Sequence, residues 1–340
     1  MKKLPKNIIV LYNLPQGNSV DDLDTQKCAL EVMRGLKAAG YEIEVVGISK
    51  DQIVDVKHLT TDLVFNLVEW AGLDYHLGVK VIEELEKTGL PYTGSDPWGY
   101  AVSCDKVLMK KLLDKNNIPT PRWQVVHNFK FKNGFASRAN LKFPLIAKTV
   151  HEHAAIGMSQ KSVVETEADL RSLISDLLEE FHQPILVEEY IAGDEAQVTV
   201  LEKLGQPWVL PPAVFRYQKK PGYWPINTYA AKWGTGWEAA MSSWTEDVAP
   251  HLVTQMQDLA RICYLKLGGR GYPRIDMRLT PAGKIYVLEV NTNPGIDFDP
   301  ESGIAVSAQK AGLSWPMLLT NIVEEAYLFH HRNRYDPALL

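Results

Sequence analysis

The sequence is poor in cysteine and lacks repeated patterns. Its three cysteines, Cys28, Cys104 and Cys263, are an odd number, lie far apart and form no CxxC motif. This argues against a disulfide framework and a zinc cluster, and it is typical of a reducing compartment. We find no internal repeat, heptad pattern or low-complexity tract, so neither a repeat protein nor a coiled coil is predicted.

Long apolar runs are also absent. The start Met1-Lys2-Lys3 resembles that of a signal peptide, but the apolar stretch that follows, residues 8–11, is too short for a signal peptide or a membrane span. We therefore expect cytoplasmic localisation and no membrane partner.

The sequence has fewer basic than acidic residues. The 36 Lys and Arg residues are outnumbered by 41 Asp and Glu residues, which gives a formal net charge of −5. A nucleic-acid surface needs a basic stripe that displaces phosphate counterions, so we expect small-molecule substrates and no nucleic-acid partner. With 340 residues, of which 46% are hydrophobic, the chain can form two or three domains with a large core.

Two runs that alternate apolar and polar side chains indicate a β-hairpin near the C-terminus. The runs are residues 274–279 and 285–291, and half-buried strands alternate in this way. We predict that residues 281–284 form a four-residue loop, which pairs Thr280 with Ile285.

The predicted register places four polar side chains on one face of the hairpin. Asp276 lies opposite Glu289, and Arg274 lies opposite Asn291. Two opposed carboxylates repel each other unless a cation lies between them. Carboxylate and amide oxygens suit Mg²⁺, which in turn suits nucleotide phosphates. The alternative is that Arg274 and Arg278 neutralise the two acids as surface ion pairs.

A turn-forming stretch follows this hairpin and favours the site interpretation. Residues 291–295 read Asn-Thr-Asn-Pro-Gly, which combines polar groups with the permissive Gly295.

Strand and helix patterns alternate over the first hundred residues. We predict strands at residues 8–12, 42–48 and 63–67, and a helix from about Asp22 to near Gly40, which together form a parallel α/β unit. Ligands bind beyond the carboxyl ends of such strands.

The loops at these strand ends, residues 13–21 and 66–74, are therefore expected to contact substrate. Asp21 and Glu69 are the candidates, although a helix cap or a solvated acid explains either residue equally well.

Turn formers at residues 90–97 mark a domain boundary. After it, Asp105 can cap a helix over residues 106–115, and a strand at residues 143–148 carries Lys148 into a loop at residues 151–157.

The loop after Lys148 suits an anion. Small residues and Gly157 let backbone N–H groups approach it closely. His151 and His153 lie in the same loop, but without further ligands they are weak evidence for zinc.

The next segments indicate a third domain. Residues 185–191 read as a strand that opens it, and residues 211–237 are rich in Gly, Pro and aromatic residues without periodicity. Such a long loop often serves as an active-site lid, and Lys232 lies within it.

These segments, in this order, resemble the ATP-grasp ligases, in particular the D-alanine:D-alanine ligase-like branch. The resemblance runs from the first strand to about Ala326 and is carried by residues 90–95, 104–106, 119–121, 157–159, 188–195, 274–276, 288–295 and 311–316. It implies an α/β ATP-grasp fold, in which an N-terminal parallel α/β domain (residues 1–97) precedes two α+β domains (98–187 and 188–340, with a lid at 211–237) that clamp ATP between them.

The resemblance also implies a role for each candidate residue. Nucleotide contacts fall on Lys106 and Lys148 (phosphates), Glu188, Glu189, Tyr190 and Ile191 (adenine), Glu195 (ribose) and Lys232 (γ-phosphate). The metal ligands are Asp276, Glu289 and Asn291, and Arg274 with the N–H of Gly295 stabilises the oxyanion. The implied cofactors are ATP and two Mg²⁺ ions, for which Mn²⁺ can substitute. A homodimer is compatible with the family.

The implied reaction forms an amide through an acyl phosphate, with release of ADP and phosphate. The chain departs from the family where the substrate binds: residues 296–302 carry Asp297, Asp299 and Glu301 before Ser302, in place of a hydroxyl-rich stretch. Acids there would repel a substrate carboxylate, so we expect an acceptor other than simple D-alanine, one with a positive charge. The alternatives are a D-alanine:D-alanine ligase of peptidoglycan synthesis and a nucleotide-binding regulator without catalysis.

Overall fold

The computed structural model of the protein describes residues 4–70, 72–129, 134–297, 299 and 302–335. Within these residues, one parallel and two antiparallel sheets form a mixed α/β fold, as the sequence predicted.

The first sheet is parallel, with strand order β2-β1-β3. Strand β3 is buried, as is β1 after Asn7, whereas the edge strand β2 is exposed or half-buried except at Ile48. Tyr100 and Cys104 of the last helix of this unit pack into the same core, so we propose that the first domain extends to Cys104. The elements are β1 (Asn7–Asn13), α1 (Val20–Ala38), β2 (Glu42–Ile48), the 3₁₀ helix η1 (Lys50–His58), β3 (Leu63–Asn66), η2 (Gly72–Asp74), α2 (Tyr75–Thr88) and α3 (Pro97–Cys104).

The second sheet is antiparallel, with strand order β4-β7-β5-β6. Because β7 lies between β4 and β5, the strand predicted to open the third domain belongs to this sheet, and we propose the boundary after Glu189. The elements are α4 (Lys106–Lys115), β4 (Trp123–Val126), α5 (Phe135–Arg138), β5 (Leu145–Thr149), η3 (Gln160–Ser162), β6 (Val163–Val164), α6 (Glu167–Phe181) and β7 (Ile185–Glu189).

The third sheet follows the order β11-β10-β8-β12-β13, and β9 pairs with β8 at its side. The expectation of one loop over residues 211–237 was wrong in part, because the strand β10 and the helix α7 lie within it. The elements are β8 (Asp194–Lys203), β9 (Gln206–Val209), β10 (Ala213–Tyr217), α7 (Tyr229–Trp233), β11 (Ser242–Thr245), α8 (Pro250–Lys266), β12 (Arg274–Leu279), β13 (Ile285–Asn291), α9 (Gly303–Lys310) and α10 (Trp315–Tyr335).

The predicted hairpin is the pair β12 and β13, but its loop differs from the prediction. Leu279, not Thr280, pairs with Ile285, and a bulge at Leu288 shifts the register back by one residue. Asp276 therefore does lie opposite Glu289, as predicted. A bulge of this kind re-aims side chains beside functional sites.

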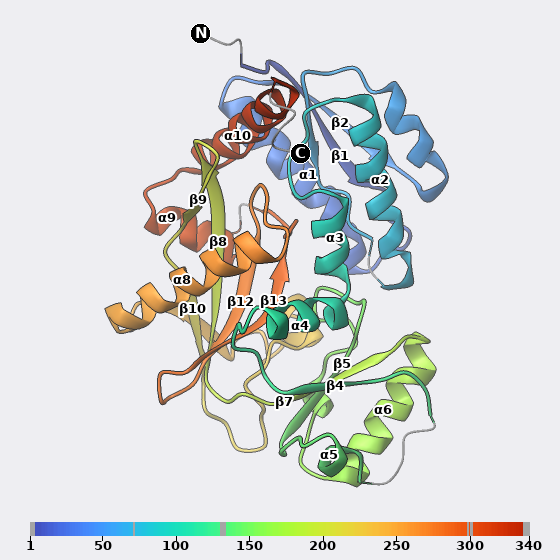
Figure 1. Ribbon diagram of the computed structural model, residues 1–340, viewed down its shortest axis with the longest axis vertical. Helices are drawn as coiled ribbons and strands as arrows, with labels where there is room; N and C mark the ends of the chain where they lie inside the picture. The colour runs from blue at the N-terminus through green and yellow to red at the C-terminus, as the bar shows by residue number, and fades with distance from the viewer. Residues whose placement is uncertain (1–3, 71, 130–133, 298, 300–301, 336–340) are drawn as a thin grey trace.

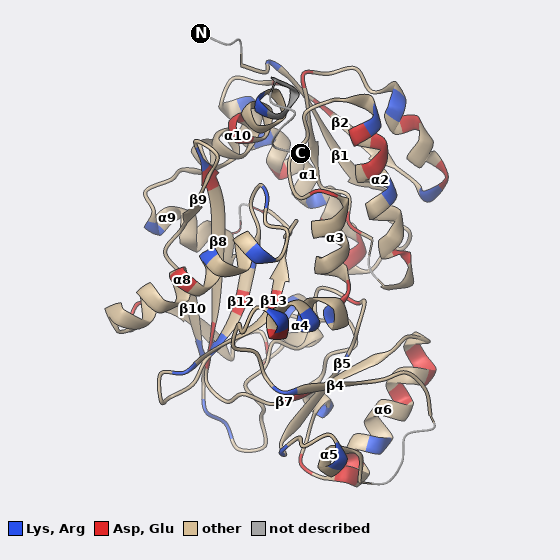
Figure 2. Cartoon of the chain, viewed as in Figure 1, with Lys and Arg blue, Asp and Glu red and all other residues tan. Residues whose placement is uncertain are grey.

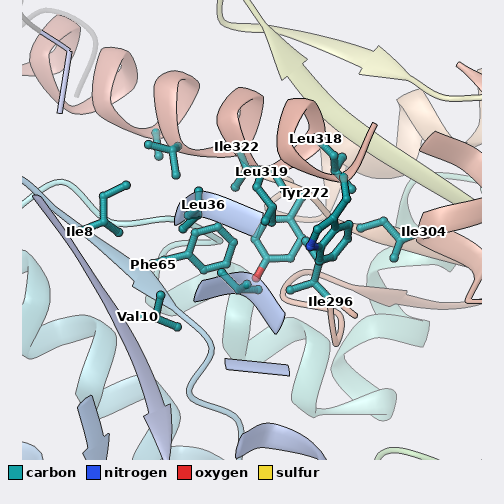
Figure 3. Packing of buried hydrophobic residues seen from close by; sticks show 14 of the residues in the cluster. Ile8, Val10, Leu36, Phe65, Tyr272, Ile296, Ile304, Leu318, Leu319 and Ile322 are labelled. Carbon is teal, nitrogen blue, oxygen red and sulfur yellow. The ribbon is translucent and has the colours of Figure 1, made fainter. Parts of the chain in front are cut away.

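Helix α10 joins the C-terminal part of the chain to the first sheet. Figure 3 shows Leu318, Leu319 and Ile322 of this helix packed with Leu36 and with Tyr272, which precedes β12. In Figure 1, α10 lies beside α1 at one end of the molecule, whereas β4, β5 and β7 lie toward the other. The first and third sheets are therefore held together by a shared core.

Charged side chains are unevenly distributed over the helices. In Figure 2, α4 carries mainly Lys, whereas α6 carries mainly Asp and Glu. None of the helices in the described ranges is long and apolar enough to cross a membrane.

Candidate active site

A cavity of about 450 Å³ lies among the three sheets, in the size range of small-molecule sites. It collects side chains from α1, α4, β5, β7, β12 and β13, which are far apart in the sequence. The predicted site residues that line it are Asp21, Glu69, Lys106, Lys148, Glu188, Glu189, Tyr190, Ile191, Glu195, Lys232, Arg274, Asp276, Glu289, Asn291 and Gly295.

The hairpin forms one wall of the cavity. Arg274 donates from Nε to Asp276 Oδ1 (2.7 Å) and from Nη2 to Asp276 Oδ2 (2.9 Å). Asn291 Nδ2 donates to Asp276 Oδ2 (3.1 Å) and to Glu289 Oε1 (3.3 Å). The two carboxylates thus lie on one face, with Arg274 neutralising the first.

Burial changes how the two carboxylates ionise. It raises the pKa of Asp276 to about 6, against the opposing attraction of Arg274. Burial would also raise the pKa of Glu289, but Lys106 and Lys148 outweigh it and lower that pKa to about 2. At neutral pH the pair therefore carries close to two negative charges.

These donors fit a hard divalent cation. Two half-buried carboxylates and an amide offer oxygen ligands of the kind that Mg²⁺ prefers, and Arg274 offsets only one of the two negative charges. Among the described residues, no group of three or more His, Cys, Asp and Glu could hold a metal, so the third protein ligand would be the Asn291 amide. The assignment of Asp276, Glu289 and Asn291 stays a prediction.

A buried ion-pair triad lies beside the hairpin. Glu188 contacts Lys110 Nζ through Oε1 (2.5 Å) and Lys148 Nζ through Oε2 (2.6 Å). Both carboxylate oxygens are therefore engaged, and we propose that Glu188 positions the lysines rather than reads adenine with its side chain. Sequence reasoning missed Lys110, although it lies four residues after Lys106 and so on the same face of α4.

Lys106 and Lys148 approach the cavity from different elements. Asp105 caps α4 by accepting from the N–H groups of Val107 (2.9 Å) and Leu108 (3.0 Å), as predicted, and this fixes Lys106 in the first turn. Lys106 Nζ donates to the carbonyl of Glu152, and Lys148 extends from β5.

The predicted ribose end contains a further ion pair. Glu195 pairs with the buried Arg278, which also donates to the carbonyls of Gly193 (2.8 Å) and Pro225 (2.7 Å). Arg278 therefore does not neutralise the hairpin acids. It holds Glu195 at the cavity wall and the segment before α7 against β12.

The helix α7 covers the cavity and carries Lys232. The hydroxyl of Tyr229 donates to Asp21 Oδ1 (2.6 Å), and Trp233 Nε1 donates to the carbonyl of Ala154 (3.0 Å). The helix thus bridges α1 and the loop after β5. Burial and the neighbouring Arg274 lower the pKa of Lys232.

Acidic side chains line the end of the cavity that faces the first sheet. Asn13 Oδ1 accepts from the N–H of Glu69 (2.9 Å), and Asp24 lies near Lys232. Burial raises the pKa of both acids. Asp24 was missed, although it follows Asp21 by three residues and shares its helix face.

The acidic loop after β13 was expected to contact substrate, and that role stays a prediction. Asp297, Asp299 and Ser302 do not line the cavity, and Glu301 lies outside the described residues. Instead, Asp297 Oδ1 accepts from the N–H of Asp299 (3.2 Å), and Ser302 Oγ caps α9 by accepting from the N–H of Ala305 (3.3 Å).

The fold and this site together define an ATP-grasp protein. A model of the D-ala D-ala ligase C-terminus matches residues 112–324. The chain belongs to that family, and with it to the ATP-dependent ligases that form C–N bonds.

Similarity to individual proteins supports this family assignment. The chain is 31% identical over 338 residues to a D-alanine–D-alanine ligase of Marinomonas sp. (strain MWYL1), covering 96% of this chain and 98% of that protein. It is 29% identical over 328 residues to the uncharacterized protein y4sG of Sinorhizobium fredii, covering 96% and 91%. The solved D-alanine–D-alanine ligase from Bacillus anthracis complexed with ATP superposes with a TM-score of 0.76 at 23% identity, covering 96% of this chain and 99% of that one, which confirms the ATP-grasp fold.

Proposed function

We propose that this protein is a carboxylate–amine ligase that activates its carboxylate as an acyl phosphate and whose acceptor is not simple D-alanine. The observation that carries the proposal is the cavity itself: Lys106, Lys148, Lys232 and Arg274 converge on it beside the opposed carboxylates of the hairpin.

In the first step, a substrate carboxylate oxygen attacks the γ-phosphorus of ATP, and ADP leaves. Lys106 and Lys148 hold phosphate oxygens in this proposal, and Lys232 reaches the γ-phosphate from α7. Asp276, Glu289 and Asn291 would hold Mg²⁺, which neutralises phosphate charge when bound.

In the second step, the amine nitrogen attacks the acyl carbon. The bond from that carbon to the phosphate oxygen breaks, phosphate leaves, and the nitrogen loses a proton. Arg274 and the N–H of Gly295 line the cavity where oxyanion charge would develop. Helix α7 keeps water from the acyl phosphate while it covers the site.

The acids of the cavity support a positively charged acceptor. Asp21 and Glu69 were suggested by the sequence as substrate contacts, and Asp24 joins them. Asp21, Asp24 and Glu69 line the cavity at the first sheet, where they can pair with an amine in addition to the reacting one. Asp297 lies near Asp24, one of these acids, although it does not line the cavity.

The second candidate is a D-alanine–D-alanine ligase, the name carried by the Marinomonas relative. Release of phosphate from Mg²⁺-ATP separates the two candidates, with D-alanine alone and then with D- and L-amino acids in pairs, basic ones included. Turnover that requires a basic acceptor supports the proposal. Steady turnover with D-alanine alone supports the second candidate and contradicts the proposed acceptor.

A further inference from the structure

We infer that His153 donates a hydrogen bond from Nε2 to an oxygen of the phosphate that is transferred from ATP. This inference rests on the proposed function, because it needs ATP in the cavity. It assigns a phosphate-binding role to a side chain in the loop after β5 that the reaction scheme above does not use.

His153 faces the cavity with an unsatisfied polar atom. It lines the cavity, and its Nε2 is buried without a hydrogen-bond partner among the described residues. A buried ring nitrogen without a partner costs free energy, so it calls for a ligand that completes it. The backbone at His153 is held in a turn, because the N–H of Ile156 donates to the His153 carbonyl (2.9 Å).

The surroundings of His153 suit an anion. Lys106 and Lys232 disfavour a proton on its ring, whereas Glu289 of the hairpin favours one. Burial, reinforced by the two lysines, lowers the pKa of His153 to about 3, so the ring is neutral. A neutral imidazole with hydrogen on Nε2 can donate to a phosphate oxygen that the lysines attract.

The backbone next to His153 also indicates a functional role for this loop. Ala154 (φ 55°) and Ala155 (φ 62°) both adopt left-handed conformations, which are strained for residues with a Cβ and tend to occur at functional sites. Neither alanine has a hydroxyl, so their side chains cannot bind phosphate. His153 supplies the side-chain donor that this loop otherwise lacks.

His151 has a different environment and does not share this role. Its Nδ1 lies 3.1 Å from the carbonyl of Cys104, and its ring stacks on Tyr75 with centroids 4.8 Å apart. These contacts hold the start of the loop against the first unit, and they do not leave His151 facing the cavity.

Nucleotide binding, measured by calorimetry with Mg²⁺, tests the inference. His153→Ala should weaken binding of the non-hydrolysable ATP analogue AMP-PNP roughly ten-fold, because a hydrogen bond to a charged group is lost, and should leave ADP binding within about two-fold. His153→Gln, which keeps a donor, should recover part of the loss. His58→Ala, an exposed histidine on η1, is the matched control and should change neither.

The comparison of AMP-PNP with ADP also guards against a folding defect, since a damaged site would lose both nucleotides. Equal weakening of both, or no weakening of AMP-PNP by His153→Ala, overturns the assignment while the proposed function stands. If the unmodified protein binds neither nucleotide, both the proposed function and the assignment fail.

Discussion

Glu188 shows how single side chains set the charge of this site. Its carboxylate holds Lys110 and Lys148 in a nearly dry environment, with 2% of the Glu188 side chain and 1% of the Lys110 side chain exposed. Burial alone would raise the pKa of Glu188, but the two lysines lower it. Removing one member of a buried pair leaves the other charge uncompensated.

We therefore predict that Glu188→Gln lowers the free energy of unfolding by about 3 to 5 kcal/mol at pH 7. The folded-state pKa lies below the unfolded one, so the stabilisation exists above the unfolded pKa of a glutamate, about 4.3, and is lost as the pH falls through the folded value. Urea unfolding of both proteins at pH 7 and pH 3 checks this. A gap that stays constant or widens toward pH 3 would contradict it.

Asp276 leads to a second prediction for a single side chain. Its pKa of about 6 means that protonation competes with a metal in the range where proteins are commonly assayed. We predict that the affinity for Mg²⁺ in the presence of ADP falls roughly ten-fold between pH 7 and pH 5, as this ligand is protonated. Calorimetric titrations of Mg²⁺ at several pH values measure this. Asp276→Asn should bind weakly throughout, and a flat profile for the unmodified protein would exclude Asp276 as a ligand.

The hairpin of β12 and β13 shows what the sequence can and cannot predict about an element. Alternation of apolar and polar residues sufficed to place Asp276 opposite Glu289. It did not reveal that the loop is one residue longer and that the bulge at Leu288 compensates, because period-2 patterns carry no signal for a bulge. Likewise, β10 is too short, and too closely flanked by Pro and Gly, for its pattern to stand out.

A hydrogen bond from Tyr229 ties helix α7 to α1, so the contribution of one hydroxyl can be tested. Tyr229→Phe removes the hydrogen bond to Asp21 and keeps the ring. The lost hydrogen bond contributes about 1 kcal/mol to holding the helix in place. We predict that its loss raises the ratio of ATP hydrolysed to amide formed by roughly five-fold, because water reaches the acyl phosphate more often.

Parallel assays of phosphate and amide product give this ratio. Tyr223→Phe is the matched control, since the hydroxyl of Tyr223 has no partner among the described residues. If the two variants show the same ratio, the contact between Tyr229 and Asp21 does not hold the lid closed.

Across the whole molecule, the core under α10 joins the two ends of the chain and so keeps the cavity assembled. Tyr272 and Ile296, on either side of the hairpin, pack with Phe65 of the first sheet and Leu319 of α10 (Figure 3). The sequence could not show this, because no local pattern reports that residues about 250 positions apart share a core. For the same reason it missed Asp24, which lines the cavity together with Asp21 and Glu69.

We predict that Leu319→Ala lowers the free energy of unfolding by about 2 to 5 kcal/mol, since a fully buried leucine leaves a cavity. Leu265→Ala, at a leucine of α8 that is 62% exposed, should cost much less. Urea unfolding of both variants measures the difference. Equal effects would show that the shared core contributes little to stability.

The acyl phosphate is best tested by isotope transfer. The substrate carboxylate is labelled with ¹⁸O, and the phosphate released from Mg²⁺-ATP with the active acid–amine pair is analysed by mass spectrometry. Attack of the carboxylate on the γ-phosphate predicts that each released phosphate carries one ¹⁸O, together with one molecule of amide product. Phosphate without label would mean that the carboxylate never attacks ATP, and that result would contradict the proposed function.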